Sequence, residues 1–336
     1  MKDAGDVVGQ GAGGVRPPGT GSRAARAYDA SMGLPVPSAA DSGELPTEVR
    51  GRDALRTAAV RATLAPSVLR TEPWRLVLTG TSLEVRADWH RRLRALDPAG
   101  RQLVISCGRA VLNARAALAD ADRAVLVERP PAPADPNLLA LLSLLGEGGG
   151  DPSLARLAAA ITDARTSAPP VVAEEVMVPP SVAFLRAAAR THDVTLDVVS
   201  EPGQLLLAAR LSRLALLQQE SDPACHAELR AWNSTPLEDG ADPVYRQVMV
   251  ILGTSRDTRV DWLRTGEALQ QLALEARGSF SVHLLPHLIE SPLAREELRT
   301  GMGLGVHPQV VLQLAPPVSG PATRRRRLVD VLSVED

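Results

Sequence analysis

A short polar segment ahead of a strand-like run offers the first candidate chemistry. The segment Ala65–Trp74 precedes the apolar residues Leu76–Leu78. Within it, Ser67 supplies a hydroxyl, Arg70 a cation and Glu72 a carboxylate. The cation and the carboxylate can both face one ligand, or they can pair with each other and plug the site. We expect the paired arrangement to be the favoured one.

Two further stretches carry groups that suit an anion. Arg165 is followed by the hydroxyls of Thr166 and Ser167, and Arg325 and Arg326 lie in a run of arginines near the C-terminus. Bidentate arginine contacts and additional O–H donors are the strong contacts of a phosphate. An equally good interpretation of the C-terminal run of arginines is the basic end of a strand that is exposed to solvent.

Other kinds of site fit the sequence poorly. His283 and His287 have the spacing of a helical metal pair, but Pro286 between them disfavours a helix and no third ligand is evident. Ser67 lies in no G-x-S-x-G motif, so it is not the nucleophile of a hydrolase. Cys107 falls on an apolar helical stripe and is expected to be a small core residue.

Composition narrows the class of protein. The chain has 336 residues, of which 45% are hydrophobic and only 2% aromatic, so it can bury a large core built from Ala, Leu and Val. A formal net charge of -2 argues against a nucleic-acid partner. No apolar run reaches the length of about 18 residues that a membrane span needs. Two cysteines and no secretory signal at the N-terminus fit the cytoplasm.

Hydrophobic periodicity predicts helices and strands that alternate, which favours α+β or α/β layers. Residues 1–48 are rich in Gly, Pro, Ser and Ala, and are expected to be disordered or to fold as a lid. Helices are expected from Arg52, from a cap at Ser106, and over 154–161, 205–217 (buried on most sides) and 262–276. Strands are expected at 76–78, 83–87, 124–127, 194–199, 248–252, 281–285 and 310–314.

A weak internal repeat is visible. The helical segment Cys107–Ala119 can be laid beside Thr265–Arg277, and each contains the pattern Gly-x-Ala-apolar. Any two helices rich in Ala and Leu can align this well, so the alternative to duplication is chance. If the two segments come from a duplication, one chain could form by itself the structure that related proteins form from two subunits.

The segment Ala65–Trp74 is similar to the flavin-binding A-P-S-x-x-N-x-Q-P-W segment of the nitroreductase superfamily. Arg70 replaces the asparagine and Glu72 replaces the glutamine of that pattern. Further segments resemble, in order, the Acg-like branch of this superfamily: Leu93–Arg101, Ile105–Gly108, Asp222–Trp232, Asp261–Leu269 and His307–Gln309. The resemblance covers about residues 50 to 332.

The resemblance implies an α+β, nitroreductase-like fold in which two fused half-domains form a pseudo-dimer. We expect a tail at 1–48, an N-terminal half at 49–150 and a C-terminal half at 151–336. One FMN would lie between the halves of a monomer. Its expected binding residues are Ser67, Arg70, Glu72, Arg165, Thr166, Ser167, Arg325 and Arg326.

The implied activity is that of a cytoplasmic FMN-dependent oxidoreductase. Hydride would pass from NAD(P)H through flavin to a small-molecule substrate, a nitroaromatic or a quinone, with no nucleic-acid or membrane partner. No side chain stands out as a catalytic acid. Because Arg70 and Glu72 depart from the family pattern, the alternative is a non-catalytic protein that binds or sequesters flavin, or a flavin-free one that acts through protein interaction.

Overall fold

The computed structural model describes residues 47–130, 134–162, 182–232, 248–277, 279–315 and 325–335. They belong to one compact unit, Leu45–Asp336. Residues 1–46 of the predicted tail lie outside the described residues, and so do Arg165, Thr166 and Ser167. The first helix, α1 (Thr47–Ala62), begins ahead of its predicted start and ends before Pro66 as expected.

One sheet is built mainly from the N-terminal half of the chain. Its strands have the order β3-β4-β2-β1-β9. Their bounds are β1 Trp74–Thr79, β2 Ser82–Ala87, β3 Arg123–Glu128, β4 Leu138–Glu147 and β9 Leu332–Glu335. Neighbours are antiparallel except β1 and β9, which are parallel, so the end of the chain completes this sheet. Buried side chains of α1 and of α2 (Arg101–Asp120) pack against it.

A second sheet has the order β5-β6-β8-β7, with every pair antiparallel. Its strands are β5 Thr195–Val199, β6 Val248–Thr254, β7 Ser281–Leu284 and β8 His307–Ala315. Along β6, Val250 and Leu252 belong to one core cluster, whereas Met249 and Ile251 belong to another. Because alternate strand residues point to opposite faces, both faces of this sheet are covered.

Different helices cover those two faces. Helices α5 (Ala183–Arg190) and α8 (Arg259–Glu275) share the cluster of Val250, while α6 (Pro202–Ser221), α9 (His287–Glu290) and α10 (Pro292–Gly301) share that of Met249. The remaining α-helices of the described residues are α3 Pro152–Ala155, α4 Ala158–Thr162 and α7 Pro223–Ala231, and single 3-10 turns lie at Val68–Arg70, Trp89–Arg91 and Leu328–Asp330. Separate helices and mostly antiparallel strands confirm the α+β class.

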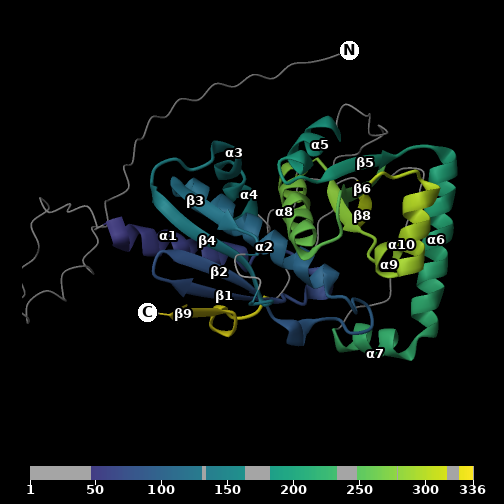
Figure 1. Ribbon diagram of the computed structural model, residues 1–336, viewed down its shortest axis with the longest axis horizontal. Helices are drawn as coiled ribbons and strands as arrows, with labels where there is room; N and C mark the ends of the chain where they lie inside the picture. The colour runs from purple at the N-terminus through teal and green to yellow at the C-terminus, as the bar shows by residue number, and fades with distance from the viewer. Residues whose placement is uncertain are drawn as a thin grey trace, which may run out of the picture. The chain divides into compact units, whose positions relative to one another are not determined.

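Helices α2 and α8 lie side by side between the two sheets (Figure 1). Their backbones meet at Gly108 and Gly266, the two glycines that the internal repeat aligns. A Cβ on Gly108 would lie 2.1 Å from the carbonyl oxygen of Leu263. One on Gly266 would lie 2.0 Å from that of Ile105. Only glycine permits the two helix backbones to lie this close. The two aligned glycines therefore mark the closest contact between α2 and α8.

The predicted start of α2 at Ser106 is wrong. The helix begins at Arg101, after Gly100 in a left-handed conformation with φ of 73°. Asp97 provides the capping acceptor, since its Oδ2 accepts the Leu103 N–H at 2.9 Å. Ser106 lies inside the helix, where its hydroxyl donates to the carbonyl of Gln102. Serine forms such bonds within helices as well as at caps, so its presence did not fix the boundary.

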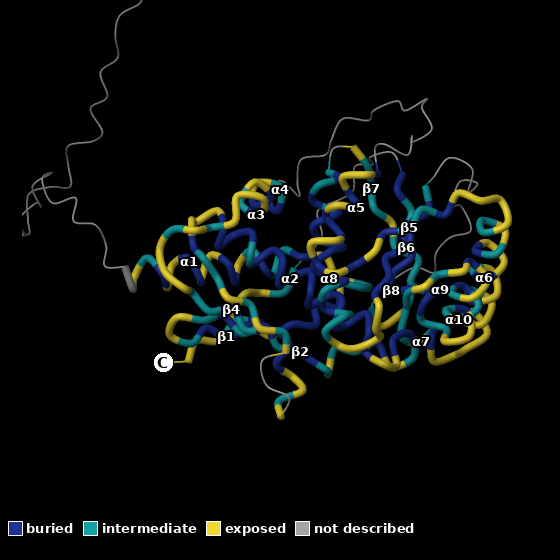
Figure 2. The backbone as a smooth tube through the Cα atoms, turned by 45° about the horizontal axis from the view of Figure 1, so that its top comes forward, coloured by how far each residue is buried: buried dark blue, intermediate teal, exposed yellow. Residues whose placement is uncertain are grey.

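The prediction that the helix at 205–217 is buried on most sides is also wrong. Of α6, only Ala208, Leu211 and Ala215 are buried, and Leu206 is 70% exposed. Figure 2 shows the contrast between exposed α6 and buried α2. Helix α6 packs one face on α9 and α10, and its leucines outside that face stay at the surface.

Candidate functional site

The loop between α1 and β1 has a constrained backbone. Leu69, Arg70 and Glu72 have φ of 43°, 56° and 43°, in the left-handed region that non-glycine residues avoid. Two hydroxyls help to hold this shape. Ser67 Oγ accepts the Glu72 N–H at 2.9 Å, and Ser106 Oγ accepts the Val68 N–H at 3.2 Å. Backbone strain maintained in this way is typical of functional loops.

The carboxylate of Glu72 is buried and turned toward the C-terminal segment. Its Oε2 accepts the backbone N–H of Arg326 at 2.8 Å, and its Oε1 lies 3.5 Å from Nη1 of Arg325. The expected pair between Arg70 and Glu72 is therefore wrong for the described residues. Arg70 is exposed, whereas Arg325 is partly buried and lies beside Glu72, where the carbonyls of Ala65 and Leu64 also hold its guanidinium.

Arg325 and Arg326 bind the loop through their guanidinium groups. Arg325 donates to the carbonyls of Ala65 at 2.7 Å and Leu64 at 3.0 Å. Arg326 donates to the carbonyl of Glu72 at 2.9 Å. Their side chains are 27% and 18% exposed, so neither is a solvated strand end. The structure therefore brings Ser67, Glu72, Arg325 and Arg326 together, with Arg70 at the rim.

A buried arginine that sequence reasoning missed lies close to this cluster. Arg109 is on α2, and its Nε donates to Gln270 Oε1 on α8 at 3.0 Å. Gln270 in turn donates to Asn113 Oδ1 at 2.9 Å. No carboxylate pairs with Arg109 among the described residues. Burial, and then the charge of Arg325, lower the pKa of its guanidinium to about 9.

A bound anion would lower the free-energy cost of burying the Arg109 guanidinium, because a buried charge normally needs a counter-charge. Nothing in the local sequence indicates that Arg109 is buried, because it lies beside the apolar stripe of α2, as a surface arginine would. Only the packing of α2 on α8 buries it.

Cys107 and a metal site are two further candidates that the sequence raised. Burial raises the pKa of the Cys107 thiol, which donates to the carbonyl of Pro73, so it is an inert core residue as expected. The described residues hold no group of three or more His, Cys, Asp or Glu able to bind a metal. None of their helices is long and apolar enough to cross a membrane.

The chain is similar over most of its length to curated proteins of Mycobacterium tuberculosis. No family model matches the chain. The curated protein "Uncharacterized protein Rv3127" of Mycobacterium tuberculosis is 30% identical over 83% of this chain and 93% of its own length. "Putative NAD(P)H nitroreductase Rv3131" of the same organism is 29% identical over 83% of this chain and 91% of its own length. "Putative NAD(P)H nitroreductase acg" is 27% identical over 86% of this chain and 98% of its own length.

The chain belongs to the Acg-like branch of the nitroreductase superfamily. The matches span nearly the full length of these relatives. Within this family the chain carries Arg70 and Glu72 where the superfamily pattern has asparagine and glutamine. The Ser67–Glu72 loop thus carries a cation and a carboxylate at those two positions.

Proposed function

We propose that this protein is an FMN-dependent oxidoreductase that passes hydride from NAD(P)H to a small nitroaromatic or quinone in the cytoplasm. The observation that carries the proposal is the constrained Ser67–Glu72 loop, with the cations Arg109 and Arg325 behind it. The relatives named as putative NAD(P)H nitroreductases support the broader class of oxidoreductase.

The described residues suit the charge of FMN. Arg109 lacks a carboxylate partner among them, and a phosphate or an electron-rich ring edge would supply the missing negative charge. Arg165, Thr166 and Ser167 remain the proposed phosphate ligands, and Ser67 and Arg70 the proposed contacts of the ring. When bound, FMN supplies the hydride chemistry, while the chain binds it, orients it and sets the charge around it.

Arg70 would act through its charge. The ring edge of a flavin becomes more negative on reduction, so a cation there favours the reduced form and a carboxylate opposes it. At about 4 Å and an effective dielectric of about 20, either charge would contribute roughly 4 kcal/mol. Since Glu72 is turned toward Arg325 and Arg70 is exposed, the cation is the charge free to face the ring.

We further propose that one chain forms the whole site as a pseudo-dimer of residues 49–150 and 151–336. The contact of Gly108 with Gly266 supports this, because the repeated helices meet at equivalent positions. So does the contact of the loop with Arg325 and Arg326, which brings the two ends of the folded region to one place. The protein would then be a monomer.

The pairing of Glu72 with Arg325 favours a second candidate, a protein that binds flavin weakly or has lost it and acts by sequestration or protein interaction. Glu72 and the carbonyls of Leu64 and Ala65 already occupy the guanidinium of Arg325. A dianionic phosphate would have to compete with those contacts.

FMN titration of the full-length protein, followed by flavin fluorescence quenching, tests the proposal. Oxidation of NADH and NADPH is then measured with menadione as the quinone acceptor. Saturable binding with turnover supports the oxidoreductase, whereas binding without turnover supports sequestration. If FMN does not bind, both flavin-based readings are contradicted.

Arg109→Met provides the structural test of that binding. It should weaken FMN affinity about tenfold, because an unopposed buried cation is removed from the site. Arg56→Met is the matched control, since Arg56 is exposed on α1 and has no ion pair among the described residues. Circular dichroism and the melting temperature establish that both variants are folded. Equal FMN affinities of the two folded variants would count against a role for Arg109.

A further inference from the structure

Helix α7 contacts a segment of the N-terminal half, Arg91–Leu96, which lies beside the loop between α1 and β1. The carboxylate of Glu228 on α7 accepts three successive backbone N–H groups of this segment, from Arg94, from Ala95 at 3.1 Å and from Leu96 at 2.9 Å. Successive N–H groups form a concave site for an anion, and their bonds to a carboxylate are charge-assisted. One side chain of the C-terminal half thus fixes the backbone of this segment.

A second contact joins the end of α7 to the same segment. Trp232 follows the last residue of α7, and the guanidinium carbon of Arg91 lies 5.0 Å from the centre of its ring. This is the distance of a cation–π contact. The Nε of the same arginine donates to the carbonyl of Thr71 in the loop. Trp232 therefore orients an arginine that itself holds the loop.

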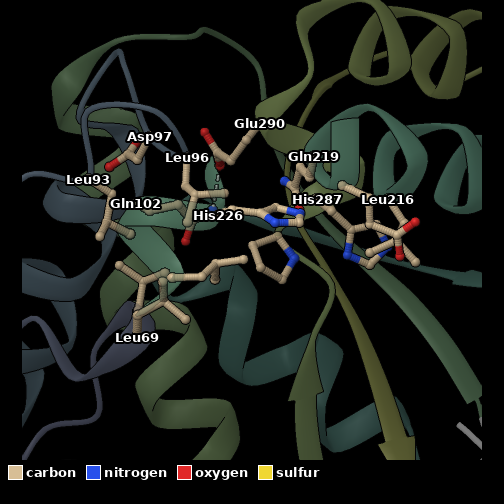
Figure 3. A pocket seen from close by; sticks show the side chains of 14 residues that line it. Leu69, Leu93, Leu96, Asp97, Gln102, Leu216, Gln219, His226, His287 and Glu290 are labelled. Atoms are coloured by element: carbon tan, nitrogen blue, oxygen red, sulfur yellow. Dashed lines mark hydrogen bonds between the residues drawn. The ribbon is translucent and has the colours of Figure 1, made fainter. Parts of the chain in front are cut away.

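A small apolar cluster fills the space between the loop, the segment and α7. Its buried members are Leu93, Leu96 and Cys225, and Val68, Leu69, Ala95, Leu229 and Trp232 pack against them. Figure 3 shows Leu69 of the loop with Leu93 and Leu96 of the segment at the wall of the pocket that these elements line. None of these residues belongs to the core cluster of the first sheet. The loop thus has apolar support from α7 that the main core does not supply.

The loop needs such support because its backbone is strained. Leu69, which packs in this cluster, has φ of 43°, and its neighbour Arg70 has φ of 56°. Non-glycine residues keep such conformations only where the surrounding structure holds them. Loss of the α7 contacts would therefore let the loop relax, although every residue expected to bind flavin would remain in the chain.

We propose that Glu228 and Trp232 are positioning residues for the flavin-binding loop. They fix the segment Arg91–Leu96, and this segment holds the loop in its strained conformation. The C-terminal half thus prepares a binding surface on the N-terminal half through residues outside the expected FMN ligands. The role of the loop in binding flavin rests on the proposed function, whereas its support by α7 does not.

Hydrogen–deuterium exchange of the full-length protein without added FMN, followed by mass spectrometry, tests this support. Peptides that cover residues 66–73 should exchange about tenfold faster in Glu228→Ala and in Trp232→Leu, because the loop opens more often. Trp232→Phe keeps an aromatic face for Arg91, so exchange should stay within about twofold of the natural rate. Arg230→Ala is the matched control and should change nothing, since Arg230 is exposed on the same helix and makes no ion pair among the described residues.

Strand β6 provides an internal reference, because its residues are mostly buried in the second sheet. A peptide that covers Val248–Thr254 should exchange at the natural rate in every variant. Unchanged exchange of the loop in Glu228→Ala and Trp232→Leu would overturn the proposal. An equal rise in exchange at β6 would overturn it too, because α7 would then support the whole fold and not the loop.

FMN titration of the same variants connects this support to flavin. Glu228→Ala and Trp232→Leu should bind FMN about tenfold more weakly, while Trp232→Phe and Arg230→Ala should bind it as the natural protein does. Natural FMN affinity in a variant whose loop exchanges faster would contradict the positioning role. If the natural protein binds no FMN, the proposed function fails, but the exchange measurement still decides whether α7 holds the loop.

Discussion

At the residue scale, Glu72 has the largest expected influence on flavin binding. It places a buried carboxylate where the superfamily pattern has a neutral glutamine, and it holds the N–H of Arg326 and the guanidinium of Arg325. Glutamine could still accept from Arg326, but it would remove the negative charge beside Arg325, which would keep its bonds to the carbonyls of Leu64 and Ala65. The Glu72 side chain thus stabilises the loop and lowers its affinity for an anionic cofactor.

Glu72→Gln should therefore raise FMN affinity about tenfold, which corresponds to about 1.4 kcal/mol. Arg70→Asn alone should bring no such gain, because Arg70 is not paired with Glu72 in the structure. Titration of both variants and the natural protein, followed by fluorescence quenching, measures the difference. The interpretation of Glu72 as an obstacle fails if Glu72→Gln binds FMN no more tightly than the natural protein.

Asp97 gives a prediction about pH. Its pKa rises from the usual 3.8 to about 7 in the folded chain. An acid whose pKa is raised by folding favours the native state at low pH, and that contribution is lost as the pH rises from about 4 to 7. Even one unit of this shift corresponds to about 1.4 kcal/mol. Asparagine has no such dependence and can still accept the Leu103 N–H.

The melting temperature of Asp97→Asn, relative to the natural protein, should thus be higher at about pH 8 than at about pH 4. Comparing the two proteins at each pH cancels the titrations that they share. A difference that stays constant across this range would mean that Asp97 titrates normally.

At the scale of elements, the α2–α8 contact is the most sensitive place in the fold. The Cβ of Gly108→Ala would meet the carbonyl of Leu263 and the backbone of Gly266, neither of which can move without shifting a helix. Such overpacking costs about 1–3 kcal/mol. At Gly203 on α6, a Cβ would meet nothing within 4 Å. Thermal denaturation should show a clear loss for Gly108→Ala and none for Gly203→Ala.

Similar melting temperatures for the two glycine variants would contradict close α2–α8 packing.

The α2–α8 contact also shows which features could be predicted from the sequence. Gly108 and Gly266 were aligned by pattern alone, and strands β1, β2, β3, β5, β6, β7 and β8 were anticipated within a few residues because their apolar runs are local signals.

The missed features depend on contacts between distant segments. Strand β4 was not predicted, although Leu138–Leu142 is mostly buried, and β9 depends on pairing with β1 at the opposite end of the folded region. The exposure of α6 could not be read from its composition, because an apolar helix is equally suited to burial on several sides. In the candidate site, the loop could be predicted because its segment is recognisable in the sequence. The partner of Glu72 and the burial of Arg109 could not be predicted, because they depend on how distant segments pack.

At the scale of the whole molecule, the last described residues complete both the first sheet and the loop. Deleting residues 325–336 removes β9, Arg325 and Arg326, so it should lower the melting temperature strongly and abolish FMN binding. Deleting residues 1–45 should change the melting temperature little, because they contain too few large apolar residues to offset the entropy of ordering them. A large loss from the N-terminal deletion would indicate that this segment packs as a lid.

The central claim is that one chain of this family member builds one flavin site between its two halves. Native mass spectrometry of the full-length protein with excess FMN tests it most directly, because it counts chains and cofactors in the same particle. We predict a complex of one chain with one FMN. Two chains around each flavin, or a chain that stays free of FMN at every concentration, would contradict a single-chain flavin site.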